Sequence, residues 1–287
     1  MRLSHTRKAL TISALLIMTG LLGQAAAAQT ASALGTEPSA PAPVTTPPPS
    51  APTTTPPSSA PATKTPPAKP TSKPIEKAIV QKRKIRTGPA GSHLTTGTDG
   101  VALTFDDGPD PDYTPVLLRM LAKEKIKATF CVVGTQARRH PDLVRAIAKA
   151  GHTLCNHTWN HDLKLGKKPV AKIKSDLERT NAAIRAAVPD AKIPYFRAPG
   201  GHFNQPVVVT AKKMGMTSIY WKVDPRDWEH PKGESPGQHR KKIIKIVQRH
   251  TRPGSIVLSH DYAQPDTIAA YRTLLPWLRQ RFRLVAL

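Results

Sequence analysis

Two adjacent carboxylates, Asp106 and Asp107, follow a short apolar run, Val101–Phe105. Gly108 and Pro109 come next and predict a turn. Enzymes with α/β folds place their chemistry at such strand ends. Successive side chains of a strand point to opposite faces, so the chain has to bend before both carboxylates can serve one site. A solvated loop or a helix cap is the alternative interpretation of this acidic pair.

Two histidines, His157 and His161, lie four residues apart in the sequence. On a helical turn this spacing puts both imidazoles on one side, where they can bind one metal ion, although it also arises often by chance. Two histidines and one aspartate form the open three-ligand set of a catalytic zinc site, which leaves a position for water and substrate. Zn²⁺ is therefore the expected ion, with Co²⁺ and Ni²⁺ as alternatives.

Three further polar clusters are candidates for a site. Arg197 can hold a carboxylate ionised through a bidentate pair, and the Gly200-Gly201 backbone can bring an N–H close to a reacting atom. The second cluster is Asp224-Pro225-Arg226-Asp227-Trp228. The third, Leu258-Ser259-His260-Asp261, suggests a general acid at His260. An ordinary surface turn and a structural histidine are the alternative interpretations of the first and third clusters.

Apolar runs alternate with amphipathic segments from about Gly100 to the C-terminus. The expected strands are Val101–Phe105, Lys127–Val133, His152–Cys155, Tyr195–Arg197, Met216–Val223, Ser255–Ser259 and Phe282–Leu287. The expected helices are Thr114–Lys123, Pro141–Ala150, Pro169–Val188, Gln205–Met214, Pro236–His250 and Asp266–Gln280. This alternation predicts an α/β fold, a distorted (β/α) barrel with about seven parallel strands. An open doubly wound sheet is less favoured because no Gly-rich phosphate loop follows the first strand. Each polar cluster falls at the carboxyl end of a predicted strand.

Residues 1–94 lack the alternating pattern of strands and helices and are not expected to belong to the folded domain. Residues 1–28 combine a basic start, an apolar run and a small-residue end, which predicts a secretory signal peptide; an uncleaved membrane anchor is the alternative. Residues 29–94 are a Pro/Thr/Ser/Ala-rich segment, predicted to be a disordered spacer with a basic end. The catalytic domain is expected over residues 95–287. No segment beyond the signal is apolar for long enough to span a bilayer.

Charge and cysteines limit the partners and the compartment. The formal net charge of +24 over 287 residues favours an anionic partner, and for an exported protein a cell-wall polymer is a better candidate than nucleic acid. Solubility alone is the other explanation. The basic run Lys82–Arg86 is either a solvated tail or an electrostatic attachment to a wall. Cys131 and Cys155 fall in consecutive predicted strands, so a disulfide and two buried thiols are both open.

Five motifs in order, TFDDGP, HTWNH, RAPGG, DPRDW and LSHD, resemble those of the NodB-like polysaccharide deacetylases, carbohydrate esterase family 4. The resemblance covers almost all of residues 100–287. It implies a distorted (β/α) barrel and metal-dependent removal of acetyl groups from polysaccharides. Many family members carry an aromatic residue where this chain has Gly200, which concerns the substrate groove more than the reaction.

The resemblance also implies a role for each site residue. Asp106 is expected to be the catalytic base, positioned by Arg197, and His260 the catalytic acid, oriented by Asp227. The implied metal ligands are Asp107, His157 and His161. Gly200, Trp228 and Leu258 are expected to bind the substrate, with the backbone N–H of Gly200 at the oxyanion and the other two around the acetyl group.

We therefore expect a secreted monomer, either free or associated with the cell wall, that hydrolyses N-acetyl groups of N-acetylglucosamine glycans, either peptidoglycan or chitin oligomers. An acetylxylan esterase would use the same residues on O-acetyl groups. A non-catalytic wall-binding module would lack a base, a ligand or an acid, and none is missing from the motifs. The hypothesis of a nucleic-acid-binding protein is supported by the positive charge alone.

Overall fold

The computed structural model describes residues 81–287. The predicted signal peptide, residues 1–28, and residues 29–80 of the predicted spacer lie outside the described residues. Among residues 81–287, no helix combines the length and the hydrophobicity that crossing a bilayer requires.

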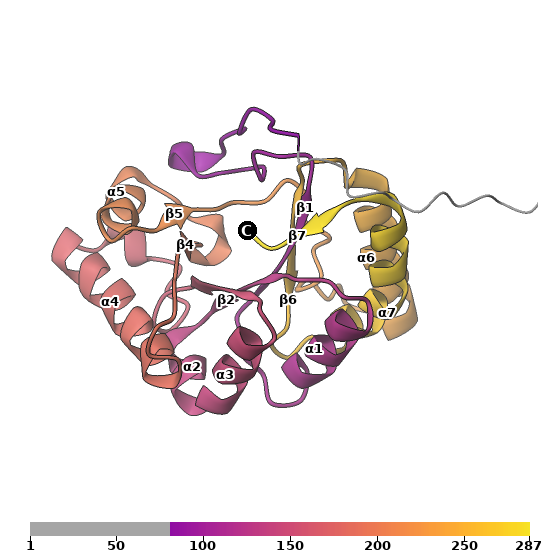
Figure 1. Ribbon diagram of the computed structural model, residues 1–287, viewed down its shortest axis with the longest axis horizontal. Helices are drawn as coiled ribbons and strands as arrows, with labels where there is room; N and C mark the ends of the chain where they lie inside the picture. The colour runs from indigo at the N-terminus through magenta and orange to yellow at the C-terminus, as the bar shows by residue number, and fades with distance from the viewer. Residues whose placement is uncertain (1–80) are drawn as a thin grey trace, which may run out of the picture. The chain divides into compact units, whose positions relative to one another are not determined.

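Seven strands form one curled sheet with helices around its outside (Figure 1). The strands are β1 (Val101–Asp106), β2 (Thr129–Val132), β3 (Thr153–Asn156), β4 (Tyr195–Phe196), β5 (Thr217–Ser218), β6 (Ile256–His260) and β7 (Leu284–Val285). Their order is β5-β4-β3-β2-β1-β6, and β7 pairs with the first two residues of β1. The pairings between these strands are all parallel, so their carboxyl ends meet at one edge.

The sheet bends back on itself after β5. The sequence predicts a strand over Met216–Val223, but only Thr217–Ser218 pairs with β4. The chain then crosses to β6, where Val223 pairs with Val257 and accepts the backbone N–H of Leu258 at 2.9 Å. The two edges of the sheet therefore approach each other, and the predicted distorted barrel of parallel strands is confirmed.

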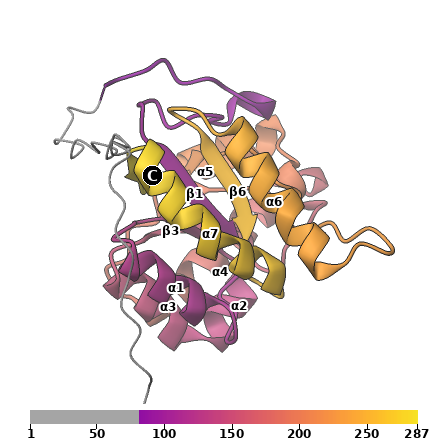
Figure 2. The same cartoon turned by 90° about the vertical axis from the view of Figure 1, so that its right-hand side faces the viewer.

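The helices agree with the predicted ranges to within one or two residues, apart from one that the sequence does not predict. They are α1 (Thr114–Lys123), α2 (Gly134–Arg139), α3 (Pro141–Lys149), α4 (Val170–Ala187), α5 (Gln205–Lys213), α6 (Pro236–His250) and α7 (Pro265–Arg281). Helix α6 shows why the pattern is readable. A capping box between Ser235 and Gln238 starts it, proline occupies its first position, and Ile243 and Val247 bury its apolar face. Helices α6 and α7 lie side by side over β1 and β6 (Figure 2).

Helix α2 is the unpredicted one. It has six residues, too few to show an apolar period, and its buried residues are Gly134, Gln136 and Ala137. A Cβ on Gly134 would lie 2.5 Å from the Trp159 ring, so only glycine lets the start of this helix approach the loop after β3. The helix therefore forms through tertiary contact rather than through its own sequence pattern.

The core has two parts because both faces of β1 are covered. All six residues of β1 are at most 2% exposed, which explains its continuous apolar run. Outside the barrel, Phe105 packs against Phe130 and Tyr271 with ring centroids 5.4 and 5.0 Å apart. Burial of each such ring stabilises the fold by roughly 1.5–3 kcal/mol. Inside the barrel lies a smaller cluster: Cys131, Cys155 and Ile219, with Tyr195 and Leu287 packed against it.

The two cysteines form a disulfide. Cys131 of β2 and Cys155 of β3 are register partners on adjacent parallel strands, with Cα atoms 4.2 Å apart. Of the two alternatives that the sequence leaves open, the structure contains the bonded form. The bond joins β2 to β3, and β3 is the strand that leads to the histidine segment of the candidate site.

The segment before β1 folds against the opposite edge of the sheet. Lys82 pairs with Thr98, Thr87 pairs with His93, and Arg83 donates its backbone N–H to the Gly97 carbonyl at 2.8 Å. Residues 81–87 are exposed. Of the two interpretations of the basic run, a solvated tail therefore describes its side chains but not its backbone, which is paired.

Candidate active site

The acidic pair lies where the chain turns sharply after β1. Asp106 is the last residue of β1, and Asp107 has a φ of 75°, in the left-handed region. Aspartate is one of the few non-glycine residues that adopt this conformation readily. The bend that lets both carboxylates face one site is thus made at Asp107 itself.

Gly108 and Asp261 fix this turn. A Cβ on Gly108 would lie 2.5 Å from Asp261 Oδ1, so a larger residue cannot replace the glycine without a shift of the backbone or of the carboxyl. Asp261 donates its backbone N–H to the Asp106 carbonyl at 3.2 Å, and its Oδ2 accepts the Thr114 hydroxyl at 2.5 Å. Burial raises the pKa of Asp261 to about 7. Its side chain therefore supports the turn from the protein interior rather than lining the cleft.

His157 and His161 reach Asp107 through an irregular turn. Thr158 and His161 have φ values of 65° and 58°, which no α-helix accommodates. The predicted helical turn is therefore wrong for this segment. The two imidazoles nevertheless lie on one side, with ring centroids 5.1 Å apart.

Asp107, His157 and His161 form a candidate metal site. One ligand atom from each lies within 4.8 Å of the others. The Nε2 atoms of both histidines are 3.3 Å from Asp107 Oδ1, a buried oxygen that makes no hydrogen bond within residues 81–287. His157 Nδ1 lies 2.9 Å from the Arg197 carbonyl and donates its proton there, which leaves Nε2 with a free lone pair. A divalent cation fits this set, because it would satisfy the unpaired oxygen and complete a His₂Asp centre.

The charges around this site also favour a cation. Burial alone would raise the pKa of Asp107, but the adjacent His157 imidazole, with smaller contributions from His260 and His161, holds that pKa below its usual range. Burial alone would lower the pKa of His157, but the carboxylates of Asp106 and Asp107 raise it. The same negative field that attracts a proton to His157 attracts a metal ion in its place.

Arg197 holds Asp106 deep in the protein. The guanidinium is completely buried, and its Nη1 donates to Asp106 Oδ1 at 2.7 Å and to Thr104 Oγ1 at 2.8 Å. Its Nη2 donates to the Tyr220 carbonyl at 3.1 Å. The predicted pairing is present, but through a single nitrogen and not as a bidentate pair. The other terminal nitrogen, Nη2, binds the arginine to the segment after β5.

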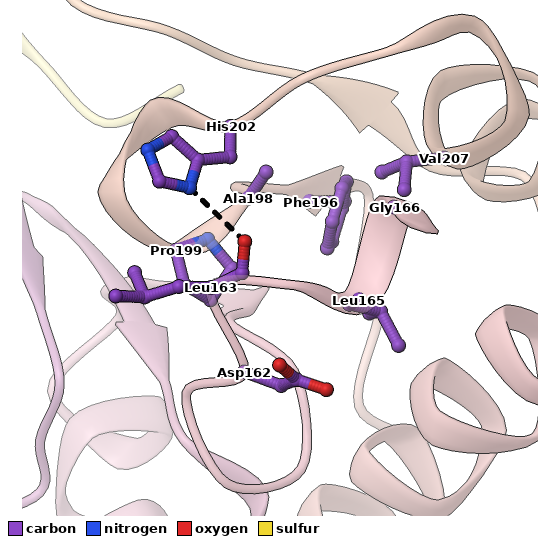
Figure 3. Close-up of a pocket in the computed structure, with 9 residues that line it drawn as sticks. All are labelled: Asp162, Leu163, Leu165, Gly166, Phe196, Ala198, Pro199, His202 and Val207. Atoms are coloured by element: carbon purple, nitrogen blue, oxygen red, sulfur yellow. Dashed lines mark hydrogen bonds between the residues drawn. The ribbon is translucent and has the colours of Figure 1, made fainter. Parts of the chain in front are cut away.

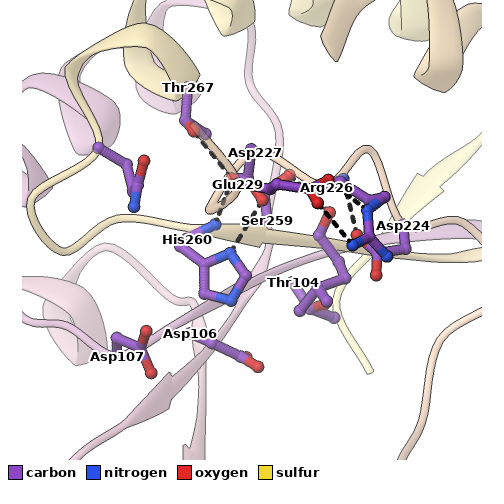
Figure 4. Close-up of polar contacts among 12 residues, drawn as sticks. Thr104, Asp106, Asp107, Asp224, Arg226, Asp227, Glu229, Ser259, His260 and Thr267 are labelled. Carbon is purple, nitrogen blue, oxygen red and sulfur yellow. Dashed lines mark hydrogen bonds and ion pairs between the residues drawn. The ribbon is translucent and has the colours of Figure 1, made fainter. Parts of the chain in front are cut away.

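His260 and Asp227 form a second buried pair on the other side of the cleft. His260 Nδ1 lies 2.9 Å from Asp227 Oδ1, and the backbone N–H of His260 donates to Oδ2 at 2.9 Å. Thr267 also donates to Oδ2, at 2.8 Å. Burial alone would lower the pKa of His260, but Asp227 raises it to about 10. Figure 4 shows the ring between Asp227 and the carboxylates of Asp106 and Asp107, with Nε2 on the cleft side.

One cleft of about 550 Å³ brings these parts together. Eight of the sequence-predicted residues line it: Asp106, Asp107, His157, His161, Gly200, Trp228, Leu258 and His260. The other two, Arg197 and Asp227, are completely buried and contact Asp106 and His260 respectively. The volume is sufficient for a sugar residue.

Six further residues line the cleft without having been assigned a role from the sequence: Leu163, His202, Tyr220, Trp221, Asp224 and Arg226. Tyr220 and Trp221 are stacked with ring centroids 4.0 Å apart, and two adjacent aromatics shortly before the Asp224–Trp228 cluster were the signal that could have found them. Asp224 and Arg226 belong to the DPRDW motif, so the sequence had already singled out their segment. Leu163 and His202 gave no signal.

Leu163 and His202 form a wall beside Gly200. Figure 3 shows His202 Nδ1 directed at the Leu163 carbonyl, 3.0 Å away. The space beneath this wall, bounded by Phe196 and Val207, is about 10 Å³, the size of a single water. A Cβ on Gly200 would lie 3.0 Å from the Leu163 side chain. Leu163 therefore occupies part of the space into which a side chain at position 200 would project.

Comparisons with known proteins agree with this fold and site. The profile of the polysaccharide deacetylase family matches residues 93–219. A chitooligosaccharide deacetylase of Sinorhizobium fredii is 37% identical over 69% of this chain and 92% of its own length. A peptidoglycan-N-acetylglucosamine deacetylase of Bacillus cereus is 38% identical over 64% of this chain and 84% of its own. The chain belongs to the polysaccharide deacetylase family, and the resemblance carried by its five motifs is confirmed.

A solved structure shows what the fold alone leaves open. A pseudoenzyme of carbohydrate esterase family 4 from Bacillus anthracis superposes with a TM-score of 0.58 and 28% identity, over 65% of this chain. The matched region spans 63% of that protein's length. Because a pseudoenzyme shares the fold, catalysis has to be argued from the side chains. In this chain the candidate metal site, the buried Asp106–Arg197 pair and the buried His260–Asp227 pair border one cleft, as a carbohydrate deacetylase requires.

Proposed function

We propose that the protein hydrolyses N-acetyl groups of N-acetylglucosamine-containing glycans, releasing acetate and leaving a free amine on the sugar. The observation that carries the proposal is the placement of two buried ion pairs beside one candidate metal site. Arg197 pairs with Asp106 at 2.7 Å, and Asp227 pairs with His260 and raises its pKa. A base and an acid at one cleft are what hydrolysis of a poor electrophile with a poor leaving group needs.

Asp107, His157 and His161 would hold the metal. A divalent ion bound there supplies Lewis-acid chemistry, polarising the acetamide carbonyl and lowering the pKa of water. Zn²⁺ suits the His₂Asp set, and Co²⁺ and Ni²⁺ are compatible with it. The lone pairs at the two Nε2 atoms and at Asp107 Oδ1 are the groups available for this role.

Asp106 is the proposed base. Its Oδ2 lies 3.7 Å from His157 Nε2, so the carboxylate borders the candidate metal site, while Arg197 is bound to the other oxygen. The hydrogen bond from Arg197 orients the carboxylate, which accepts the proton of the attacking water. Fixing one oxygen by a hydrogen bond leaves the other free for that proton.

His260 is the proposed acid. Its Nδ1–H is directed to Asp227, and the raised pKa keeps the ring doubly protonated at neutral pH. Nε2–H can then give its proton to the sugar nitrogen as the C–N bond breaks, so that an amine leaves rather than an amide anion. The backbone N–H of Gly200 borders the same cleft and is the proposed donor to the oxyanion, and Trp228 and Leu258 are the proposed walls around the acetyl methyl group.

The substrate and the location are part of this proposal. The relatives from S. fredii and B. cereus are named for chitooligosaccharides and for peptidoglycan N-acetylglucosamine. The sequence of residues 1–28 supports export, and the net charge of +24 supports contact with an anionic cell wall. We therefore propose a secreted, wall-associated enzyme that acts on peptidoglycan or on chitin oligomers.

The test is acetate release by the purified chain from three substrates: N-acetylglucosamine oligomers, peptidoglycan and acetylated xylan. We expect release from the first two, loss of release with a chelator, and recovery when Zn²⁺, Co²⁺ or Ni²⁺ is added. Faster release from acetylated xylan would favour the O-deacetylase alternative. Absence of release from all three with metal restored would point to a wall-binding module and would overturn the proposed activity.

A further inference from the structure

A second groove lies at the edge of the sheet opposite the active site. Its volume is about 600 Å³, and it is lined by Arg83, Lys84, Arg86, Thr95, Thr98, Lys222, Arg252, Pro253, Gly254 and Ser255. Thr98 lies shortly before β1, and Ser255 comes directly before β6. The groove is therefore at the amino ends of the strands, whereas the catalytic residues are at the carboxyl ends.

The groove is strongly cationic. Five of its lining residues are Lys or Arg, and none is acidic. All five cations are exposed, and none of them takes part in an ion pair among residues 81–287. Unpaired cations gathered in one concavity repel one another and attract an anion. This arrangement differs from the isolated lysines of an ordinary soluble surface.

The positions of these cations are set by backbone contacts. Arg86 donates its N–H to Thr95 Oγ1 at 3.0 Å and accepts the N–H of Leu94 at 2.7 Å. Ile85 packs over Gly97, where a Cβ would lie 2.8 Å from the isoleucine side chain. A Cβ on Gly254 would lie 2.8 Å from the Thr98 carbonyl. Close approaches at two glycines thus hold the basic run against the start of β1 and β6.

Hydroxyl groups complete the lining. Thr95 Oγ1 accepts the N–H of Arg86, and Ser255 Oγ accepts the N–H of Arg252 at 3.0 Å. Each hydroxyl thereby uses an acceptor lone pair and keeps a proton to donate. Guanidinium, ammonium and hydroxyl donors around one concavity are suited to phosphate oxygens.

The lining excludes other ligand classes. It contains no aromatic side chain, so it offers no platform for stacking nucleobases or sugar rings. Its apolar contribution is limited to Pro253 and side-chain stems, which does not suit a protein partner with a hydrophobic anchor. A charged, base-free chain is the ligand that needs only what the groove provides.

A row of cations continues away from the groove along α6. Lys241, Lys245 and Arg249 are exposed at intervals of four residues and lead toward Arg252. Residues at this spacing lie on one face of a helix, and the row extends about 12 Å at the α-helical rise. A ligand longer than the groove therefore meets further positive charge, which favours a polymer over a single ion.

We infer that the groove formed by Arg83, Lys84, Arg86, Lys222 and Arg252 binds a linear phosphate polyanion without bases, such as a chain of phosphodiester-linked polyols. Because the groove is at the opposite edge from the catalytic cleft, the polymer and the glycan substrate can be bound together. The groove would then retain the enzyme on a surface that carries both. This inference goes beyond the proposed activity and does not depend on it.

The test uses the full chain and inorganic polyphosphate as the probe. The groove variant combines Arg83→Gln, Lys84→Gln and Arg86→Gln, which removes three charges but keeps part of each side-chain stem. The control variant combines Arg145→Gln, Lys149→Gln and Lys172→Gln, exposed residues of α3 and α4 that do not line the groove. Both variants change the net charge equally. Affinity is measured at several salt concentrations, with thermal unfolding and acetate release from a neutral chitin oligomer as checks on folding and on the catalytic cleft.

We expect the groove variant to bind polyphosphate about 10–100-fold more weakly, and the slope of log K against log salt to fall by about 2, since each lost contact removes about 0.7. The control should change far less. Unfolding and acetate release should be the same in all three proteins. A chain that releases no acetate but still shows this difference in binding would contradict the proposed activity and leave the groove assigned.

Equal losses in the two variants would show attraction by total charge alone and would overturn the inference. An unchanged affinity in the groove variant would overturn it as well. Single-stranded DNA of matched charge provides the third comparison. If it binds more than about tenfold tighter than polyphosphate, base contacts contribute, and the assignment to a base-free polymer is wrong.

Discussion

At the carboxyl ends of the strands the Asp106–Arg197 and His260–Asp227 pairs are buried, whereas the cations that line the groove at the amino ends are exposed and form no ion pair among residues 81–287. Arg197 and Asp227 are completely buried, and the side chain of each makes three hydrogen bonds to neighbouring residues. Arg83, Lys84 and Arg86 are exposed and form no ion pair among residues 81–287. The same barrel thus has buried ion pairs at one edge and exposed cations without ion pairs at the other.

The difference follows from what each edge does. A reacting group has to be held in one geometry and one protonation state, which burial with a partner provides. Removing one partner then leaves a buried charge unpaired, so single substitutions have large effects. A surface that binds a flexible polymer needs charge but little geometry, so its residues act additively and each contributes little. The comparison therefore predicts steep losses at one edge and shallow, cumulative losses at the other.

The largest effect is expected at the candidate metal site. His157→Ala removes a ligand whose Nδ1 is fixed by the Arg197 carbonyl. We expect loss of the bound metal and of nearly all acetate release, measured by metal analysis of the dialysed protein and by the oligomer assay. His250→Ala, an exposed histidine at the end of α6, is the control and should keep both. Full metal content in the His157 variant would show that the ion is bound elsewhere.

The next largest effect is expected for the proposed base and acid. Asp106→Asn and His260→Ala should each lower kcat by about 10²–10⁴, since each removes one proton transfer. The metal content should remain near that of the wild type, because neither residue belongs to the Asp107, His157 and His161 set. Loss of metal from both variants would overturn the division of roles. Loss from Asp106→Asn alone would place that carboxylate on the ion.

These residues could be found from the sequence because parallel strands bring their carboxyl ends together. Strand β1 is mostly apolar because both of its faces are covered, and the helical period of α6 is clear at Ile243 and Val247. With the strands located, the polar clusters after them had to meet at one edge. Composition could not distinguish Asp106 from Asp107; the family resemblance assigned their roles, and the structure places only Asp107 close to both histidines.

What the sequence did not reveal depends on contacts between distant loops. Helix α2 needs the close approach of Gly134 to Trp159, and the turn at Thr158–His161 replaces a helical turn with two left-handed residues. Leu163 reads as one more exposed leucine until the Leu163–His202 contact puts it beside Gly200. Local pattern carries no information about such pairs, because the residues that decide them are far apart in the chain.

An intermediate effect is expected for Asp227→Asn, and it should appear in the pH profile. The acid works only when His260 is protonated, so kcat/KM falls as the pH rises through the pKa of His260. That pKa, raised to about 10 by Asp227 in the folded protein, is brought down by a bound divalent cation, but it remains dependent on Asp227. Loss of the carboxylate charge should move the alkaline decline down by roughly 1–3 pH units.

The His260–Asp227 pair should also make the free energy of unfolding depend on pH, and this contribution falls as the pH rises. A pKa raised on folding contributes stability that is complete below the unfolded value of 6.5 and is lost as the pH rises through the folded value. The difference in unfolding free energy between the wild type and Asp227→Asn should therefore shrink as the pH is raised from 6 toward 10. A difference in unfolding free energy that stays constant over this pH range, or an alkaline decline of kcat/KM at the same pH in both proteins, would show that His260 is not the titrating acid.

The smallest effect is expected at the amino edge, for single charges. Arg86→Gln should weaken binding to polyphosphate only a few-fold and lower the salt slope by about 0.7, and Arg83→Gln should do the same. The two losses should add in the double variant, because exposed cations do not depend on one another for position. Unfolding free energies should stay within about 0.5 kcal/mol of the wild type. A loss in the double variant much larger than the sum would mean that these arginines bind one phosphate jointly, and the amino edge would then share the fixed geometry of the carboxyl edge.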